Sequence, residues 1–123
     1  MTGKIIRILA LSLLLSACSS SKQTNEYQRI NAEKAKEIMQ DTSVIILDVR
    51  TQEEYAQGHI PNAQLLPLDQ IDQIADFAAK NDTILVYCRS GNRSAQAADY
   101  LVQLGYVNVY DFGGIISWPY DIE

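Results

Sequence analysis

The chain has 123 residues, of which 47% are hydrophobic and 20% charged, a composition typical of one globular domain and not of a disordered chain or a repeat array. Ten basic and fifteen acidic residues give a formal net charge of −5. A chain this acidic lacks the excess of basic residues that nucleic-acid binding needs. One histidine and two cysteines far apart in the sequence form no cluster at metal-ligand spacing. We therefore expect no nucleic-acid partner, no zinc or iron–sulfur site and no cofactor.

Residues 1–17 have the features of an export signal. Lys4 and Arg7 form a positively charged start, and a short apolar run follows them. This run is too short to cross a bilayer, which takes about 20 apolar residues. Residues 15–18, Leu-Ser-Ala-Cys, resemble the lipobox of bacterial lipoproteins, which implies cleavage before Cys18 and acylation of that cysteine. A plain secretory signal is the alternative.

Residues 18–25 are expected to be a lipidated cysteine and a flexible tether, because the polar stretch after Cys18 has no apolar periodicity. The globular domain is expected to span residues 26–123. Without residues 1–17 the chain keeps eight basic and fifteen acidic residues, a formal charge of −7, and offers no polybasic patch to anionic lipids. We therefore expect a monomer in the bacterial cell envelope, attached to a membrane on its extracytoplasmic side through the lipid alone.

Short apolar runs alternate with segments of helical periodicity after Tyr27, which is typical of βα units around a mostly parallel sheet. Two of these runs are continuous and rich in β-branched residues, as in central strands buried on both faces. The predicted elements are a helix over 32–40 begun by Asn31, strands over 44–47 and 84–87, a helix over 70–80 begun by Asp69, a helix over 94–104 ended by Gly105, and a strand over 107–110.

Cys88 stands at the end of the second of these strands, and the six residues after it lead directly toward a predicted helix. In such a loop, backbone N–H groups turn inward and the helix N-terminus adds unpaired donors, which together make an anion cradle. These surroundings favour the thiolate, the nucleophilic form of cysteine. Gly91 permits a tight loop, and Arg89 and Arg93 add positive charge for an anionic substrate. A structural cysteine and solvated surface arginines are the alternatives.

Residues 88–94, Cys-Arg-Ser-Gly-Asn-Arg-Ser, resemble the active-site loop of the rhodanese family, specifically of its single-domain sulfurtransferases. Residues 47–63, with Leu-Asp-Val-Arg, Glu-Tyr and Gly-His-Ile-Pro-Asn-Ala, are similar to the family's first signature, and Phe-Gly-Gly at 112–114 with Trp118 is similar to its last. The resemblance covers Tyr27 to Tyr120. It implies a rhodanese-like three-layer α/β domain with a mostly parallel five-stranded sheet and helices on both faces.

The resemblance also implies an enzyme of the thiosulfate sulfurtransferase type. Cys88 would take the outer sulfur of an anionic donor such as thiosulfate, sulfite would leave, and a thiol or cyanide would remove the sulfur from the resulting persulfide. No cofactor is required. The substrate-binding positions that the resemblance implies are Arg89, Ser90, Gly91, Asn92, Arg93 and Ser94.

Residues outside the loop are expected to serve the structure. Asp48 and Arg50 should organise a turn or pair with neighbours such as Glu54. His59, the only histidine, should make a structural hydrogen bond in its turn and not act as a general base. The glycines at 113–114 should let the backbone approach the active-site loop closely.

Two other functions share features of this loop. Phosphatases of the cell-division-cycle type resemble rhodaneses, but their signature has five residues between cysteine and arginine, whereas four separate Cys88 from Arg93 and Ser94 follows. A loop one residue smaller fits a single sulfur atom better than a tetrahedral phosphate. A non-enzymatic persulfide carrier or redox-linked binding module would have the same loop, so this alternative stays open at the level of the sequence.

Overall fold

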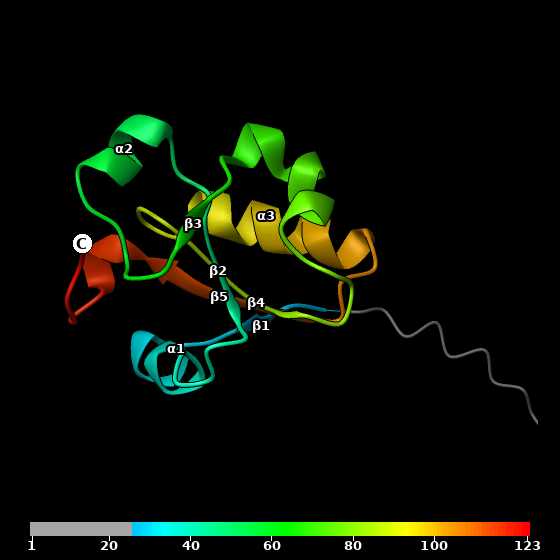
Figure 1. Ribbon diagram of the computed structural model, residues 1–123, viewed down its shortest axis with the longest axis horizontal. Helices are drawn as coiled ribbons and strands as arrows, with labels where there is room; N and C mark the ends of the chain where they lie inside the picture. The colour runs from blue at the N-terminus through cyan, green and yellow to red at the C-terminus, as the bar shows by residue number, and fades with distance from the viewer. Residues whose placement is uncertain (1–25) are drawn as a thin grey trace, which may run out of the picture.

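The computed structural model describes residues 26–123 as a single parallel sheet between helices (Figure 1). The expected signal, Cys18 and the tether lie outside the described residues. The sheet order is β1-β5-β4-β2-β3 and every strand pair is parallel, so the predicted α/β class with a five-stranded sheet is confirmed. The strands are β1 (Gln28–Arg29), β2 (Ile45–Asp48), β3 (Gln64–Leu65), β4 (Thr83–Cys88) and β5 (Asn108–Gly114).

Helices cover both faces of the sheet (Figure 1). The helix α1 (Ala32–Ile38) packs on one face, and the 3-10 helix η1 (Leu68–Asp76) and the helix α3 (Asn92–Gln103) pack on the other. The short helix α2 (Gln52–Ala56) follows β2, and the 3-10 turn η2 (Ile115–Ser117) follows β5. No helix within residues 26–123 is long and apolar enough to cross a membrane.

Alternate residues of the central strand β4 fill two separate cores. Val86 and Cys88 belong to the core under α3 and η1, whereas Leu85 and Tyr87 belong to the core under α1. All four side chains are at most 1% exposed, which explains why the strand is a continuous run of apolar residues. This alternation places Cys88 on the α3 side of the sheet, where the loop after it turns into the helix.

Two predicted helices differ from the structure in their bounds: α1 ends two residues early, and α3 both begins and ends before its predicted bounds. Asn31 caps α1 as predicted, since its side chain accepts a hydrogen bond from the Lys34 N–H at 2.8 Å, but the helix ends at Ile38 and not at residue 40. The helix α3 begins at Asn92, two residues before the predicted start, because Gly91 takes the position before the first turn. Part of the predicted loop is therefore the first turn of α3.

The predicted α-helix over residues 70–80 with Asp69 as its cap is wrong. The structure has the 3-10 helix η1 there, which starts after Pro67 and has no side-chain cap. The buried side chains Ile71 and Ile74 are three residues apart and align in a 3-10 helix, which has three residues per turn. The last strand is also longer than predicted, reaching Gly114 and not residue 110.

Candidate active site

Cys88 ends β4 and is 1% exposed, with its sulfur facing the start of α3. The Gly91 N–H donates a hydrogen bond to Cys88 Sγ at 3.0 Å. Gly91 has a φ of +104°, a left-handed conformation that residues with a Cβ rarely adopt, and this turn directs its N–H back toward the sulfur. The positive end of the 12-residue helix α3 therefore lies next to Cys88, as the sequence predicts.

Ser94 is a second polar neighbour of the sulfur. The side chain is fully buried in the first turns of α3, and its Oγ lies 3.6 Å from Cys88 Sγ. The same Oγ lies 3.1 Å from the Gly91 carbonyl oxygen and 3.4 Å from that of Gly113. A hydroxyl has one hydrogen to donate, so Ser94 donates to a carbonyl while the thiol is protonated and can rotate to donate to an anionic sulfur.

The end of β5 packs against the loop that follows Cys88. Gly114 pairs with Cys88 across the sheet, and the Ile116 N–H donates to the Arg89 carbonyl at 3.2 Å. A Cβ on Gly114 would overlap the carbonyl oxygen of Arg89 and lie 2.6 Å from Ser90 Cα. The expected close approach of this backbone to the active-site loop is therefore present in the structure.

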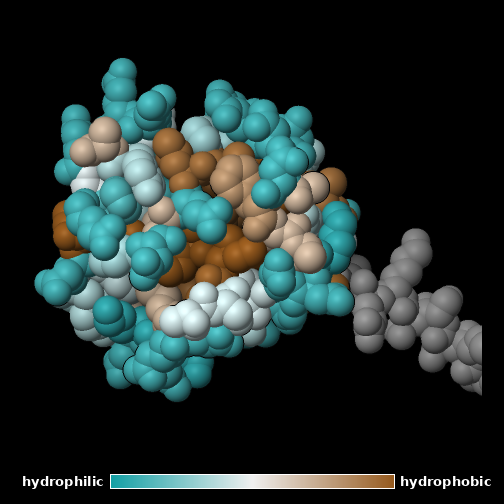
Figure 2. Space-filling view, viewed as in Figure 1, coloured by the Kyte–Doolittle hydropathy of each residue, from teal (hydrophilic) through white to brown (hydrophobic). Residues whose placement is uncertain are grey.

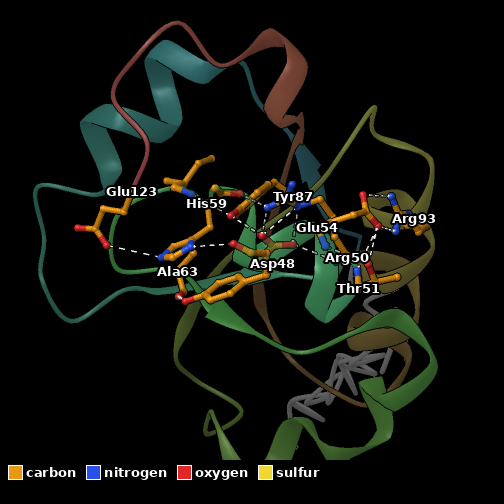
Figure 3. Close-up of polar contacts among 12 residues, drawn as sticks. Asp48, Arg50, Thr51, Glu54, His59, Ala63, Tyr87, Arg93 and Glu123 are labelled. Carbon is orange, nitrogen blue, oxygen red and sulfur yellow. Dashed lines mark hydrogen bonds and ion pairs between the residues drawn. The ribbon is translucent and has the colours of Figure 1, made fainter.

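Arg93 is held in a two-point ion pair with Glu54 of α2 (Figure 3). The N···O distances are 2.7 and 3.0 Å, and Glu54 also accepts from the Thr51 backbone N–H in a capping box. Hydrogen bonds from Arg93 lower the pKa of Glu54 to about 2. The hydrogen bonds to Glu54 likewise hold the pKa of Arg93 above its ordinary value. Of the two alternatives predicted for Asp48 and Arg50, the structure has the local turn, in which the Arg50 N–H donates to Asp48 at 2.9 Å. Pairing with Glu54 does not occur, because Arg93 of α3 occupies that carboxylate.

Neither α2 nor the role of Glu54 as the partner of Arg93 was predicted from the sequence. The signal for the helix was present: Thr51 followed three residues later by Glu54 is the capping-box pattern. Nothing in the local pattern pointed to the ion pair, since the partners lie 39 residues apart.

The remaining residues of the loop face the solvent. Arg89, Ser90 and Asn92 are exposed. Within residues 26–123, no carboxylate lies within ion-pair distance of Arg89, in contrast to Arg93. Arg89 lines a hollow of about 310 Å³ whose other walls include Arg50, Glu54, Ile116 and Ile122. The structure thus gives the two loop arginines different surroundings: Arg89 is available to an anion, and the charge of Arg93 is neutralised.

Asp48, Arg50 and Tyr87 form a buried polar network beneath this site (Figure 3). Arg50 donates to both carboxylate oxygens of Asp48, the shortest distance being 2.7 Å, and also to the Gly58 carbonyl at 2.7 Å. The Tyr87 hydroxyl donates to Asp48 at 2.6 Å and accepts from the Ile60 N–H at 3.1 Å. Burial, followed by the hydrogen bond to Asp48, raises the pKa of Tyr87. The network fixes the loop after α2 to the ends of β2 and β4.

His59 lies in the loop after α2, and its contacts are with Tyr55 and Glu123 and not with the loop that follows Cys88. Its ring stacks on Tyr55 with centroids 3.8 Å apart, and Nδ1 lies 3.1 Å from the Tyr55 carbonyl oxygen. Nε2 lies 3.6 Å from the Glu123 carboxylate, and the backbones of His59 and Glu123 exchange two hydrogen bonds (Figure 3). These contacts fit the predicted structural role, which stays a prediction. No cluster of three or more metal-binding side chains occurs within residues 26–123.

Stability at acid pH should depend on the Glu54–Arg93 pair. Because the folded state lowers the pKa of Glu54 from 4.5 to about 2, the pair should stabilise fully above the higher value and lose its contribution as the pH falls through the lower one. We expect Glu54→Gln to lower the free energy of unfolding by about 1 kcal/mol at neutral pH, measured by urea denaturation. The difference should shrink steadily as the pH falls from 4.5 toward 2.

Glu37→Gln is the matched control for this measurement. Glu37 forms a more exposed ion pair with Lys34 at 3.5 Å, and its removal should change stability by less than about 0.5 kcal/mol. Equal effects of the two substitutions at every pH would show that the Glu54–Arg93 pair contributes no more than an ordinary surface contact.

A buried cysteine in a backbone-lined loop, at the point where a parallel strand passes into a helix, defines the class of α/β domains that hold a charged sulfur or an anion with backbone N–H groups. Residues 31–119 match the family described as the rhodanese-like domain, and the chain belongs to that family.

Relatives and solved structures agree with this assignment. A sulfurtransferase of Allochromatium vinosum is 43% identical over 91 residues, which cover 72% of this chain and 85% of the relative. A thiosulfate sulfurtransferase of Coxiella burnetii is 34% identical over 93 residues, covering 75% and 87%. The crystal structure of a rhodanese-like domain protein from Staphylococcus aureus has a TM-score of 0.69 at 34% identity, covering 78% of this chain and 96% of that one.

Proposed function

We propose that the protein is an enzyme that transfers a sulfane sulfur from thiosulfate, or a similar anionic donor, to a thiol or cyanide through a persulfide on Cys88. The observation that carries this proposal is the hydrogen bond from the Gly91 N–H to Cys88 Sγ at 3.0 Å, made at the N-terminus of α3. This hydrogen bond and the helix dipole both stabilise an anionic sulfur on Cys88. The relatives named sulfurtransferases support the same chemistry.

The reaction divides into two steps at one sulfur atom. The Cys88 thiolate attacks the outer sulfur of thiosulfate, a new S–S bond forms, and sulfite leaves with the electron pair of the broken bond. The acceptor then attacks the outer sulfur of the persulfide, and the electron pair of that S–S bond returns to Cys88 as thiolate. No oxidant, reductant or cofactor enters either step.

The loop residues divide the remaining work. Arg89 is exposed and has no ion pair within the described chain, so it is suited to attract the doubly charged donor. Arg93 is held by Glu54, so its part is to fix the first turn of α3 and with it the Gly91 N–H. The Ser94 hydroxyl can rotate to donate a hydrogen bond to the sulfur when the sulfur is anionic. Ser90 and Asn92 are exposed at the mouth of the loop.

Mass spectrometry of a chain beginning at Glu26 tests the proposal. Thiosulfate should add one sulfur atom, about 32 Da, and cyanide should remove it, because the sulfur is held covalently by a nucleophile. Cys88→Ser should show no adduct, while Gln96→Ala, at an exposed position of α3 outside the loop, should keep it. An adduct of the same mass on Cys88→Ser would place the sulfur elsewhere and end the proposal.

We further propose that the protein is exported and anchored in the bacterial cell envelope through lipid on Cys18. The support is the lipobox-like sequence before Cys18 and the acidic balance of the rest of the chain, which gives anionic lipids no basic patch. The acyl chains would then supply the membrane affinity.

Metabolic labelling with a fatty acid tests the anchor in bacteria that make the full chain. Cys18→Ala should abolish the label and block processing at that site, because the acylated thiol is removed. Ser19→Ala changes the next residue, and this variant should still carry the fatty-acid label and still sediment with the membranes. Fatty-acid label that persists on Cys18→Ala would contradict the proposed anchor.

A further inference from the structure

A hollow of about 360 Å³ flanks the active-site loop on the side of α2 and η1. Its walls are mostly apolar and come from three segments: Val49 after β2, Pro67 and Leu68 at the start of η1, and Arg93 in α3. Figure 2 shows apolar surface between the hydrophilic side chains of α2 and those of η1. Leu68 is half-buried, so part of its side chain remains open to a ligand.

Cys88 does not line this hollow, but two residues that do, Val49 and Arg93, lie beside the neighbours of Cys88. The Val49 N–H donates to the carbonyl of Tyr87, the residue before Cys88, at 3.1 Å, and Val49 and Cys88 belong to the same core. Arg93 directly precedes Ser94, whose Oγ lies 3.6 Å from the cysteine sulfur. A molecule seated against Val49 and Arg93 is therefore next to the loop that would hold the persulfide.

The charges around the hollow do not favour an anion. Arg93 is neutralised by Glu54, and Arg50, which also borders the hollow, is neutralised by Asp48 at 2.7 Å. Asp69 adds a carboxylate at the exposed rim. Arg89, which has no ion pair within residues 26–123, instead borders a second hollow, whose lining also includes Arg50, the paired carboxylate Glu54, and Ile116 and Ile122. The donor anion and an apolar ligand therefore have different surfaces on the two flanks of one loop.

We propose that the hollow of Val49, Pro67, Leu68 and Arg93 binds the apolar chain of the sulfur acceptor, and that the preferred acceptors are uncharged alkyl thiols. This inference rests on the proposed function and names the acceptor class for its second step. The bound thiol first gives up its proton to solvent. Its thiolate then attacks the outer sulfur, the persulfide S–S bond breaks with its electron pair staying on Cys88 Sγ, and the acceptor leaves as an alkyl persulfide. Burial of the alkyl chain against the partly exposed side chains of Pro67 and Leu68 supplies the affinity.

The test is a series of n-alkanethiol acceptors from ethanethiol to pentanethiol, with thiosulfate as donor. Complete burial of one methylene corresponds to a factor of about four, and in this open hollow we expect kcat/KM for the acceptor to rise at least about twofold per methylene. Leu68→Gln should abolish the rise of kcat/KM with chain length. Leu68→Met, which keeps an apolar side chain of similar volume, should show the same rise as the unaltered protein. Ile116→Gln, on the other flank and 67% exposed, should also retain it.

A measurement on the unaltered protein guards against misfolding of Leu68→Gln. 1-Pentanol has the chain but no thiol, so it should raise the KM for pentanethiol severalfold and leave the KM for cyanide nearly unchanged. A flat alkanethiol series together with no effect of 1-pentanol would overturn the acceptor site, even if thiosulfate still adds a sulfur to Cys88. A slope that persists unchanged in folded Leu68→Gln would also overturn it. Absence of the sulfur adduct itself would instead overturn the proposed function.

Discussion

Replacing Gly114 with alanine is expected to lower kcat/KM for thiosulfate by about a hundredfold, the scale of loss that follows a shift of about 1 Å in a reacting group. The new Cβ would overlap the Arg89 carbonyl and lie 2.6 Å from Ser90 Cα. Both neighbours are backbone atoms, so a rotamer change cannot relieve the clash and the loop itself has to move. That movement separates the Gly91 N–H from Cys88 Sγ, now 3.0 Å apart.

Gly113→Ala is the matched control one residue away. Gly113 has a φ of +85°, so alanine there is strained by about 1–2 kcal/mol, but its Cβ would meet no atom within 4 Å. We expect Gly113→Ala to lower the melting temperature while keeping most of the activity per folded molecule. Steady-state kinetics at a temperature where circular dichroism shows both variants folded separates the two effects. Equal loss of activity in both variants would mean that backbone strain, and not the close approach at Gly114, governs the loop.

Arg50→Met is expected to lower the free energy of unfolding by about 3–5 kcal/mol, because it leaves a buried carboxylate without its cation. Asp48 is fully buried and Arg50 is 5% exposed. Arg50 supplies the only basic side chain bonded to Asp48 among the described residues, and the Tyr87 hydroxyl would be left as its one side-chain donor. Arg50 also holds the Gly58 carbonyl at 2.7 Å, so the loop that carries His59 should loosen.

Urea denaturation of Arg50→Met beside Arg29→Met tests this expectation. Arg29 is exposed on the edge strand β1, so its replacement should change stability by less than about 0.5 kcal/mol. Tyr87→Phe should cost an intermediate amount, about 1–3 kcal/mol, since it leaves the Ile60 N–H without its acceptor and Asp48 without one donor. If Arg50→Met unfolds at the same urea concentration as Arg29→Met, the Asp48–Arg50 pair adds nothing to stability.

The sequence by itself determined the α/β architecture and the position of Cys88 where a strand passes into a helix. Continuous apolar runs over residues 44–47 and 84–87 predicted central parallel strands, because both faces of such a strand are buried and carry apolar side chains. A cysteine followed closely by a glycine and then a helix predicted the backbone cradle. Each of these features depends on residues near one another in the chain, where spacing alone fixes which groups meet.

Only the tertiary structure decided which side chains pair across the site. Glu54 and Arg93 lie 39 residues apart, as do Asp48 and Tyr87, and they meet because β2 pairs with β4 in a register that sets Asp48 beside Tyr87. That register follows from the packing of both sheet faces together, which no local pattern records. Within the described residues it leaves Arg89 without an ion pair, whereas two parallel hydrogen bonds to the Glu54 carboxylate neutralise the charge of Arg93.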